Sequence, residues 1–180
     1  MTFLPITRYD DLGPEGRAAS ESTLGARGGS TNLEATLLSS LPSFTAYAQV
    51  HALADALAPY IGERAVSLFS YAISDENDCL VSAAFYRRIL RDNGEDPDNP
   101  QVTEAEQLLI DWGRLIVSRP SAIPEDFYAR LEAAFNPQLR VLLLAYAGQV
   151  VATNLFATVG RVPLDESLLG YRRPGDERTF

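Results

Sequence analysis

Lysine is missing from this 180-residue chain, and histidine, cysteine, methionine and tryptophan occur once each. Without lysine, the chain carries neither a Schiff-base lysine nor the lysine of a phosphate-binding loop. A single cysteine excludes a disulfide within one chain. One cysteine and one histidine also cannot supply a metal site built from several such ligands. We therefore expect no metal and no cofactor, and only a few residues that can do chemistry.

Negative charge is in excess. The chain holds 24 acidic residues against 15 basic ones, which gives a formal net charge of −9. A surface of that sign repels a phosphate backbone, so nucleic acid is not expected as a partner. A chain of 180 residues is also short enough to form one compact domain around one core.

Two segments bear on where the protein resides. The first eight residues have no basic stretch leading into an apolar run, so they lack the form of a secretory signal. The stretch from Val141 to Val159 approaches the length of a membrane span. Polar residues such as Gln149 and Asn154 interrupt it, and its alanine content suits a helix buried on all sides by protein. We expect a cytoplasmic protein with no membrane partner, in keeping with its lone thiol.

Helix signals punctuate the chain, and no strand-like alternation is sustained. Thr31 and Thr103 each stand three residues before a glutamate, which is the capping-box form of a helix N-terminus. Ser40-Leu41-Pro42 begins a helix that we expect to reach Ala58, where Pro59 ends or kinks it. The fold class predicted from these signals is all-α.

The remaining helices follow from the same signals. A short helix is expected over 63–72, and the cap-type residues at 74–77 then start a helix that reaches Asp92. Pro137 opens the long apolar helix that Gly160 terminates. We divide the chain into an N-terminal arm at 1–30 with a flexible glycine-rich connection, a helical domain at 31–160 and a C-terminal tail at 161–180.

The segment that contains the cysteine carries the most specific pattern. Glu76, Cys79, Ser82 and Tyr86 occur at the spacing Glu-x-x-Cys-x-x-Ser-x-x-x-Tyr, ahead of a glycine at 94. This resembles the Glu-x-x-Cys-x-x-Cys-x-x-x-His signature of the alkylhydroperoxidase D and carboxymuconolactone decarboxylase superfamily. The flanking helices agree, so the resemblance covers about residues 32 to 159, although only the cysteine segment is specific.

The resemblance implies an alkylhydroperoxidase-like helical bundle that assembles as trimers, hexamers or dimers, with the motif helix near subunit contacts. In thiol-dependent members, the second cysteine attacks the peroxide and the first resolves the sulfenic acid, while glutamate and histidine relay protons. This sequence differs at two of those positions. Ser82 replaces the attacking cysteine and Tyr86 replaces the histidine, which leaves Cys79 at the resolving position and Glu76 as the relay carboxylate.

On one helix, Cys79, Ser82 and Tyr86 share a face, so we expect them to line one wall of a pocket, with Glu76 one turn earlier. Peroxide reduction requires a thiolate. The helix start favours the thiolate, whereas nearby acids oppose it, so a sluggish thiol is expected. His51 shares an inward-facing stripe with Phe44 and can supply the missing imidazole, or it can be a buried neutral histidine with a structural partner.

Three interpretations remain open. The first is a peroxidase that reduces an organic peroxide through Cys79 alone, with Glu76 or His51 moving protons and an external thiol as reductant. The second is a non-redox enzyme or binding protein for a lactone or another small apolar metabolite, suggested by Ser82 and Tyr86. The third is a structural or partner-binding helical protein. All three predict a homo-oligomer, because the apolar terminal helix needs burial beyond one small chain.

Overall fold

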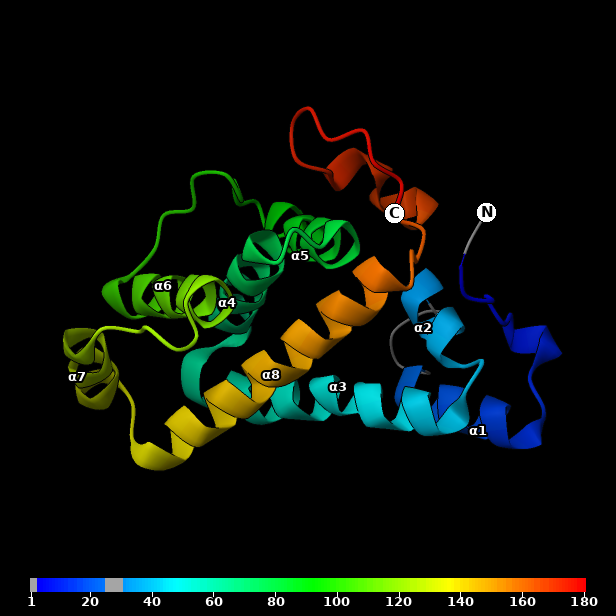
Figure 1. The fold of residues 1–180 in the computed structure, drawn as a ribbon, viewed down its shortest axis with the longest axis horizontal. Coiled ribbons are helices and arrows are strands. Elements are labelled where there is room, and N and C mark those ends of the chain that lie inside the picture. Colours follow the sequence, from blue (N-terminus) through cyan, green and yellow to red (C-terminus); the bar gives the residue numbers. More distant parts are fainter. Residues whose placement is uncertain (1–2, 25–30) are drawn as a thin grey trace.

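The computed structural model describes residues 3–24 and 31–180, and no strand occurs in those ranges. The helices are η1 (Tyr9–Asp11), α1 (Pro14–Leu24), α2 (Asn32–Leu37), α3 (Leu41–Ile61), α4 (Glu63–Glu76), α5 (Leu80–Asp92), α6 (Glu104–Ser118), α7 (Glu125–Ala134), α8 (Pro137–Val159) and η2 (Glu166–Tyr171). The all-α prediction is confirmed (Figure 1). The predicted glycine-rich connection lies outside the described ranges.

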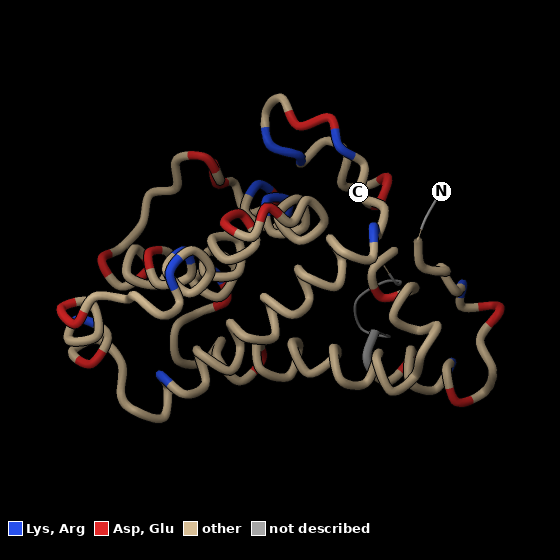
Figure 2. Tube along the Cα trace, viewed as in Figure 1, with Lys and Arg blue, Asp and Glu red and all other residues tan. Residues whose placement is uncertain are grey.

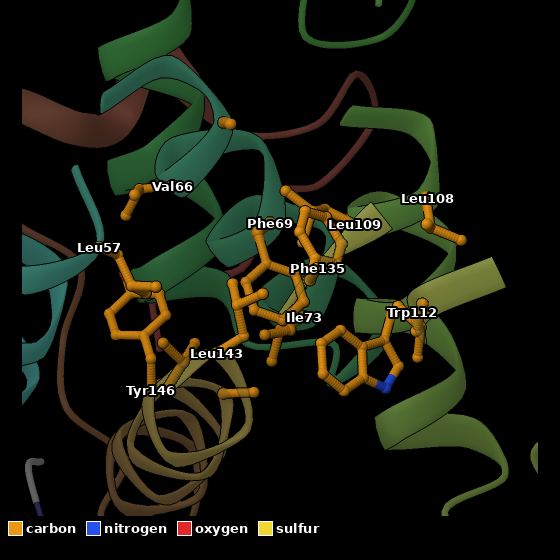
Figure 3. Close-up of a cluster of buried hydrophobic side chains, with 14 of the residues drawn as sticks. Leu57, Val66, Phe69, Ile73, Leu108, Leu109, Trp112, Phe135, Leu143 and Tyr146 are labelled. Atoms are coloured by element: carbon orange, nitrogen blue, oxygen red, sulfur yellow. The ribbon is translucent and has the colours of Figure 1, made fainter. Parts of the chain in front are cut away.

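Helix α4 is the centre of the bundle, because α3, α5, α6 and α8 all pack against it (Figure 1). Its Phe69 is fully buried between Trp112 of α6, with ring centroids 6.0 Å apart, and Tyr146 of α8, at 6.4 Å. Leu57 and Leu143 complete the inner surface of the same core (Figure 3). Burial of such large side chains supplies most of the driving force that holds the helices together.

The predicted helix starts at Thr31 and Thr103 are confirmed in detail. In both, the threonine hydroxyl accepts a hydrogen bond from the backbone N–H three residues on, and the glutamate there accepts one from the threonine N–H. This reciprocal arrangement satisfies two donors that the first helical turn leaves free. At Thr31, it also fixes the position of Glu34.

Two predicted helix ends are wrong. Helix α3 continues through Pro59 to Ile61 and stops at Gly62, whose φ of 85° suits glycine. Helix α4 does not end at residue 72 but runs on to Glu76. The residues at 74–77 therefore complete α4 instead of capping the next helix. The reason is packing, since Ser74 is fully buried and donates a hydrogen bond to Asn154 of α8.

Helix α8 is not buried on all sides as the sequence suggests. Its inner face contributes to the core, but Val141 is 70% exposed and Leu155 64% exposed. It is also long and apolar enough to cross a membrane by length and composition. Figure 2 shows that α3 and α8 are almost free of charged residues. No helix among the described residues covers these outward-facing side chains of α8.

The C-terminal segment is tied to the helical body. Leu164 and Leu168 pack against α5, and the carbonyl of Tyr171 accepts a hydrogen bond from Arg87. Arg173 pairs with Asp75 at the end of α4. These contacts place residues 161–180 beside α5, so the segment predicted as a tail forms one wall of the molecule (Figure 1).

Candidate functional site

Cys79 is the residue immediately before α5, and its side chain is 1% exposed. Its neighbours are the apolar side chains of Val81, Ala157 and Val162. The thiol makes one polar contact among the described residues, a hydrogen bond from Sγ to the hydroxyl oxygen of Ser82 at 3.5 Å. A thiol in such surroundings behaves as a small buried apolar group.

The space beside Cys79 is a crevice of about 10 Å³. Arginines of the C-terminal segment line it: Arg173 pairs with Asp75, and Arg178 pairs with Asp78 at 2.8 Å. A water molecule needs roughly 10–15 Å³ of such space. The crevice is therefore too small for an organic peroxide in this conformation.

Glu76 does not begin the motif helix. It is the last residue of α4, it is exposed, and it has no hydrogen bond or ion pair with any described residue. Between it and Cys79, Asp78 adopts a φ of 51°, which turns the chain from α4 into α5. The expectation that Glu76 lies one turn before Cys79 on the same helix is therefore wrong, because the two residues belong to different elements.

A cavity of about 100 Å³ lies between α2, α3, α5 and α8. Ser82, Tyr86 and His51 line it together, whereas Cys79 and Glu76 do not. Most of the other lining residues are apolar or aromatic: Leu33, Leu37, Phe44, Tyr47, Ala48, Val50, Val81, Phe85, Val150 and Leu168. The structure thus brings three of the five predicted site residues to one cavity. The sulfur of Cys79 lies outside this cavity and contacts the lining residue Ser82.

A larger groove of about 650 Å³ adjoins this cavity. Glu34, His51, Tyr86 and Asp165 line both spaces, so these side chains stand where the cavity meets the groove. Small ligands bind preferentially in apolar hollows that carry a few convergent polar groups. The inner cavity has that composition.

His51 is neither fully buried nor isolated. Its Nε2 lies 3.6 Å from Oε1 of Glu34, with side chains 33% and 15% exposed. The other carboxylate oxygen of Glu34 accepts a hydrogen bond from the N–H of Thr31 at 2.8 Å. Burial raises the pKa of Glu34, but the interactions with His51 and Thr31 outweigh it and leave the pKa below its usual value. Glu34 is therefore kept ionised beside the imidazole.

Tyr86 is connected to a buried polar chain. The hydroxyl of Ser70 donates to the carbonyl of Val66 at 2.7 Å and lies 2.6 Å from the hydroxyl of Tyr146. Because the proton of Ser70 is engaged, Tyr146 donates to Ser70. Burial, together with the neighbouring phenol of Tyr86, raises the pKa of Tyr146 well above its usual value. Tyr146 therefore stays protonated next to Tyr86.

Asp165 is a site residue that the sequence does not reveal. One carboxylate oxygen accepts a hydrogen bond from the N–H of Asn32 at 2.8 Å. The other oxygen, Oδ2, is buried and has no hydrogen-bond partner among the described residues. Burial and the negative charge of Glu34 raise the pKa of Asp165 above its usual value. Two carboxyl groups at the same opening thus have pKa values shifted in opposite directions.

The sequence signals for these residues are partial. Glu34 is recognisable only as the glutamate of a capping box, the third residue of α2, which explains its place in the helix but not its contact with His51. Asp165 lies in a stretch with no periodic pattern. Tyr146 reads as one apolar residue of a long helix. All three acquire their roles from contacts between segments that are far apart in the chain.

No protein-family profile and no curated protein matches this sequence. Solved structures do. An uncharacterized peroxidase-related protein from Ralstonia eutropha, described as an alkylhydroperoxidase AhpD core, has a TM-score of 0.76 at 16% identity, covering 93% of this chain and 94% of that one. An uncharacterized peroxidase-related protein from a Silicibacter species has a TM-score of 0.76 at 16% identity, covering 96% of each chain.

This chain has the AhpD-like fold. A protein of unknown function from Agrobacterium tumefaciens gives the same result, with a TM-score of 0.62 at 19% identity over 71% of this chain and 93% of that one. The resemblance found in the cysteine segment is confirmed at the level of the fold. At these identities, the likeness shows the fold alone.

Proposed function

We propose that this protein is a non-redox enzyme that binds a small, mostly apolar metabolite in the cavity between α2, α3, α5 and α8 and transfers a proton to or from it. One observation carries the proposal. The AhpD-like fold here gathers His51, Glu34, Tyr86 and Ser82 around one cavity and leaves Cys79 outside it. The reactive positions of the site are therefore acid–base groups.

Each group has a distinct role in this proposal. His51 is the proton acceptor, because imidazole is the side chain most often used for proton transfer and Glu34 holds the ring in place from 3.6 Å. Ser82 accepts the S–H of Cys79, which leaves its own hydroxyl proton for the ligand. Tyr86 orients the ligand from the opposite end of the same helix face, while the apolar walls exclude water.

Binding is tested with a neutral probe. Benzyl alcohol titrated into isotope-labelled protein should shift the amide signals of Ser82, Tyr86 and Val150. Ala48→Phe places a ring in the cavity and should abolish these shifts. Ala46→Phe, on the exposed side of the same helix, is the matched control and should leave them unchanged. Shifts that persist in Ala48→Phe would contradict the proposed site.

The catalytic role of the cavity is tested by a second pair of variants. With any substrate found by screening small metabolites, His51→Gln should reduce kcat by about 100-fold or more, a typical loss for a general base. Cys79→Ala should leave kcat within about twofold of the wild type, since the sulfur lies outside the cavity. Complete loss of activity in Cys79→Ala, with the fold intact, would contradict non-redox chemistry.

A second function, peroxide reduction by Cys79, is favoured by one contact. The thiol is hydrogen-bonded to Ser82, which lines the cavity, so a single side chain separates the sulfur from that space. In this reaction the thiolate attacks the peroxide O–O bond, which yields an alcohol and a sulfenic acid, and an external thiol then reduces the sulfenic acid. Cumene hydroperoxide with dimedone should label Cys79 if this reaction occurs. If the protein consumes no peroxide and forms no dimedone adduct, this reaction is excluded.

A further inference from the structure

The polar groups at the mouth of the cavity have an unbalanced charge. Glu34 and Asp165 supply two carboxyl groups, and no arginine occurs among the described residues that line the inner cavity. The sequence has no lysine to contribute from elsewhere. An anionic ligand in the inner cavity would therefore meet two acids, and the only described groups at the opening that can carry positive charge are the imidazole of His51 and, on the groove side, Arg88.

One carboxylate oxygen of Asp165, beside this opening, lacks a hydrogen-bond donor among the described residues. Its Oδ1 is held by the N–H of Asn32, but its buried Oδ2 receives no hydrogen bond from the described residues. A buried carboxylate oxygen without a donor is costly, and native proteins satisfy nearly all such atoms. This incompletely compensated carboxylate beside the opening favours a ligand that carries positive charge.

The walls around the two acids are aromatic. Phe44, Tyr47, Phe85 and Tyr86 all line the cavity. Aromatic faces attract cations, and organic ammonium ions are bound in this way when carboxylates stand nearby. The protein shows the effect at the edge of the site, where the guanidinium of Arg88, on the groove side, lies 5.1 Å from the ring of Phe85.

We infer that the ligand of this cavity is an organic cation, a small apolar molecule with one protonated amine that the carboxylates of Glu34 and Asp165 bind. The inference rests on the proposed function and narrows its substrate class. The apolar body of the ligand occupies the aromatic chamber. The ammonium group lies at the opening, beside the carboxylates of Glu34 and Asp165.

Three probes that share one ring and differ in charge test the inference. Dissociation constants for benzylamine, benzyl alcohol and benzoate are measured by calorimetry or NMR titration near neutral pH. Benzylamine should bind at least about tenfold more tightly than benzyl alcohol, a modest gain for one charge-assisted contact. Benzoate should bind the most weakly. Binding of benzoate as tight as that of benzylamine would overturn the inference.

Two variants test whether Asp165 and Glu34 cause the preference for benzylamine. Asp165→Asn and Glu34→Gln should each lower the affinity for benzylamine by about tenfold and leave the affinity for benzyl alcohol unchanged, which also shows that the cavity is intact. Glutamine preserves the capping box at residue 34. Glu76→Gln, an exposed carboxyl away from the cavity, is the matched control and should change neither affinity.

The outcomes separate the two proposals. Benzyl alcohol binding in the cavity without a preference for the amine contradicts the organic-cation inference alone and leaves the proposed function standing. A preference for benzylamine that both variants retain also contradicts it. If none of the three probes binds, the small-molecule site itself is excluded, and the inference with it.

Discussion

The imidazole Nε2 of His51 lies 3.6 Å from a carboxylate oxygen of Glu34. This contact joins the third turn of α3 to the first turn of α2, at the point where the inner cavity meets the groove. The capping box at Thr31 fixes Glu34 from the other side. One carboxylate therefore both starts a helix and orients the only histidine of the chain.

The pKa of Glu34 should respond to this contact. Its carboxyl carbon, followed by NMR as a function of pH, should titrate below the usual range for glutamate. His51→Ala removes one of the groups that stabilise the carboxylate, so the pKa should rise. The carboxyl of Glu76 provides the internal reference, since it makes no contact with either residue. An unchanged titration of Glu34 in His51→Ala would show that the pair does not interact.

Asp165 should make the free energy of unfolding increase as the pH falls. Because its pKa is raised in the folded state, ionisation costs stability above the folded-state pKa, and this cost disappears below the unfolded-state pKa. The free energy of unfolding of the wild type, relative to Asp165→Asn, should therefore increase as the pH falls from about 7 to about 4. Urea denaturation at several pH values measures it. A difference that stays constant, or decreases, as the pH falls would show that the pKa of Asp165 is not raised in the folded protein.

Cys79 should react slowly in the folded protein. Its burial and the narrow crevice under Arg173 and Arg178 predict a rate with a disulfide reagent on the order of 100-fold below that of the unfolded chain. Arg178→Gln breaks the ion pair with Asp78 and should speed the reaction by loosening the C-terminal segment. Rapid labelling of the native wild type would mean that the sulfur is accessible.

The outer face of α8 should mediate self-association. Val141, Leu144, Leu155 and Val159 are all more than half exposed on this helix. Leu155→Glu would place a charge in the apolar face and should shift the protein toward monomers by light scattering at micromolar concentration. Gln138→Glu, an exposed polar position on the same helix, should have no effect. A wild-type protein that is monomeric at this concentration would contradict the prediction that α8 mediates self-association.

The local parts of the fold are predictable from the sequence. Capping at Thr31 and Thr103 depends on residues three apart, so the pattern is visible in the chain. The end of α4 cannot be predicted in this way. Serine is a residue type that favours helix N-caps, but Ser74 is kept inside α4 by its hydrogen bond to Asn154. That contact is made across the bundle, and no local pattern records it.

The candidate site shows the same division. Helical spacing correctly places Ser82 and Tyr86 on one cavity wall, and His51 reaches the same cavity from α3. The spacing also groups Cys79 with them, but the helix begins one residue after the cysteine, which turns the sulfur toward Val81 and Val162. Asp165 is found only once the C-terminal segment has been placed against α2.

The most direct measurement is a crystal structure of the protein with benzylamine bound. We expect the ring in the aromatic cavity and the amine nitrogen about 3 Å from a carboxylate oxygen of Glu34 or Asp165. Cys79 should remain buried and unmodified. A ligand that lies against Cys79 instead, or a cavity that stays empty while benzylamine binds elsewhere on the chain, would contradict the assignment of this cavity as the functional site.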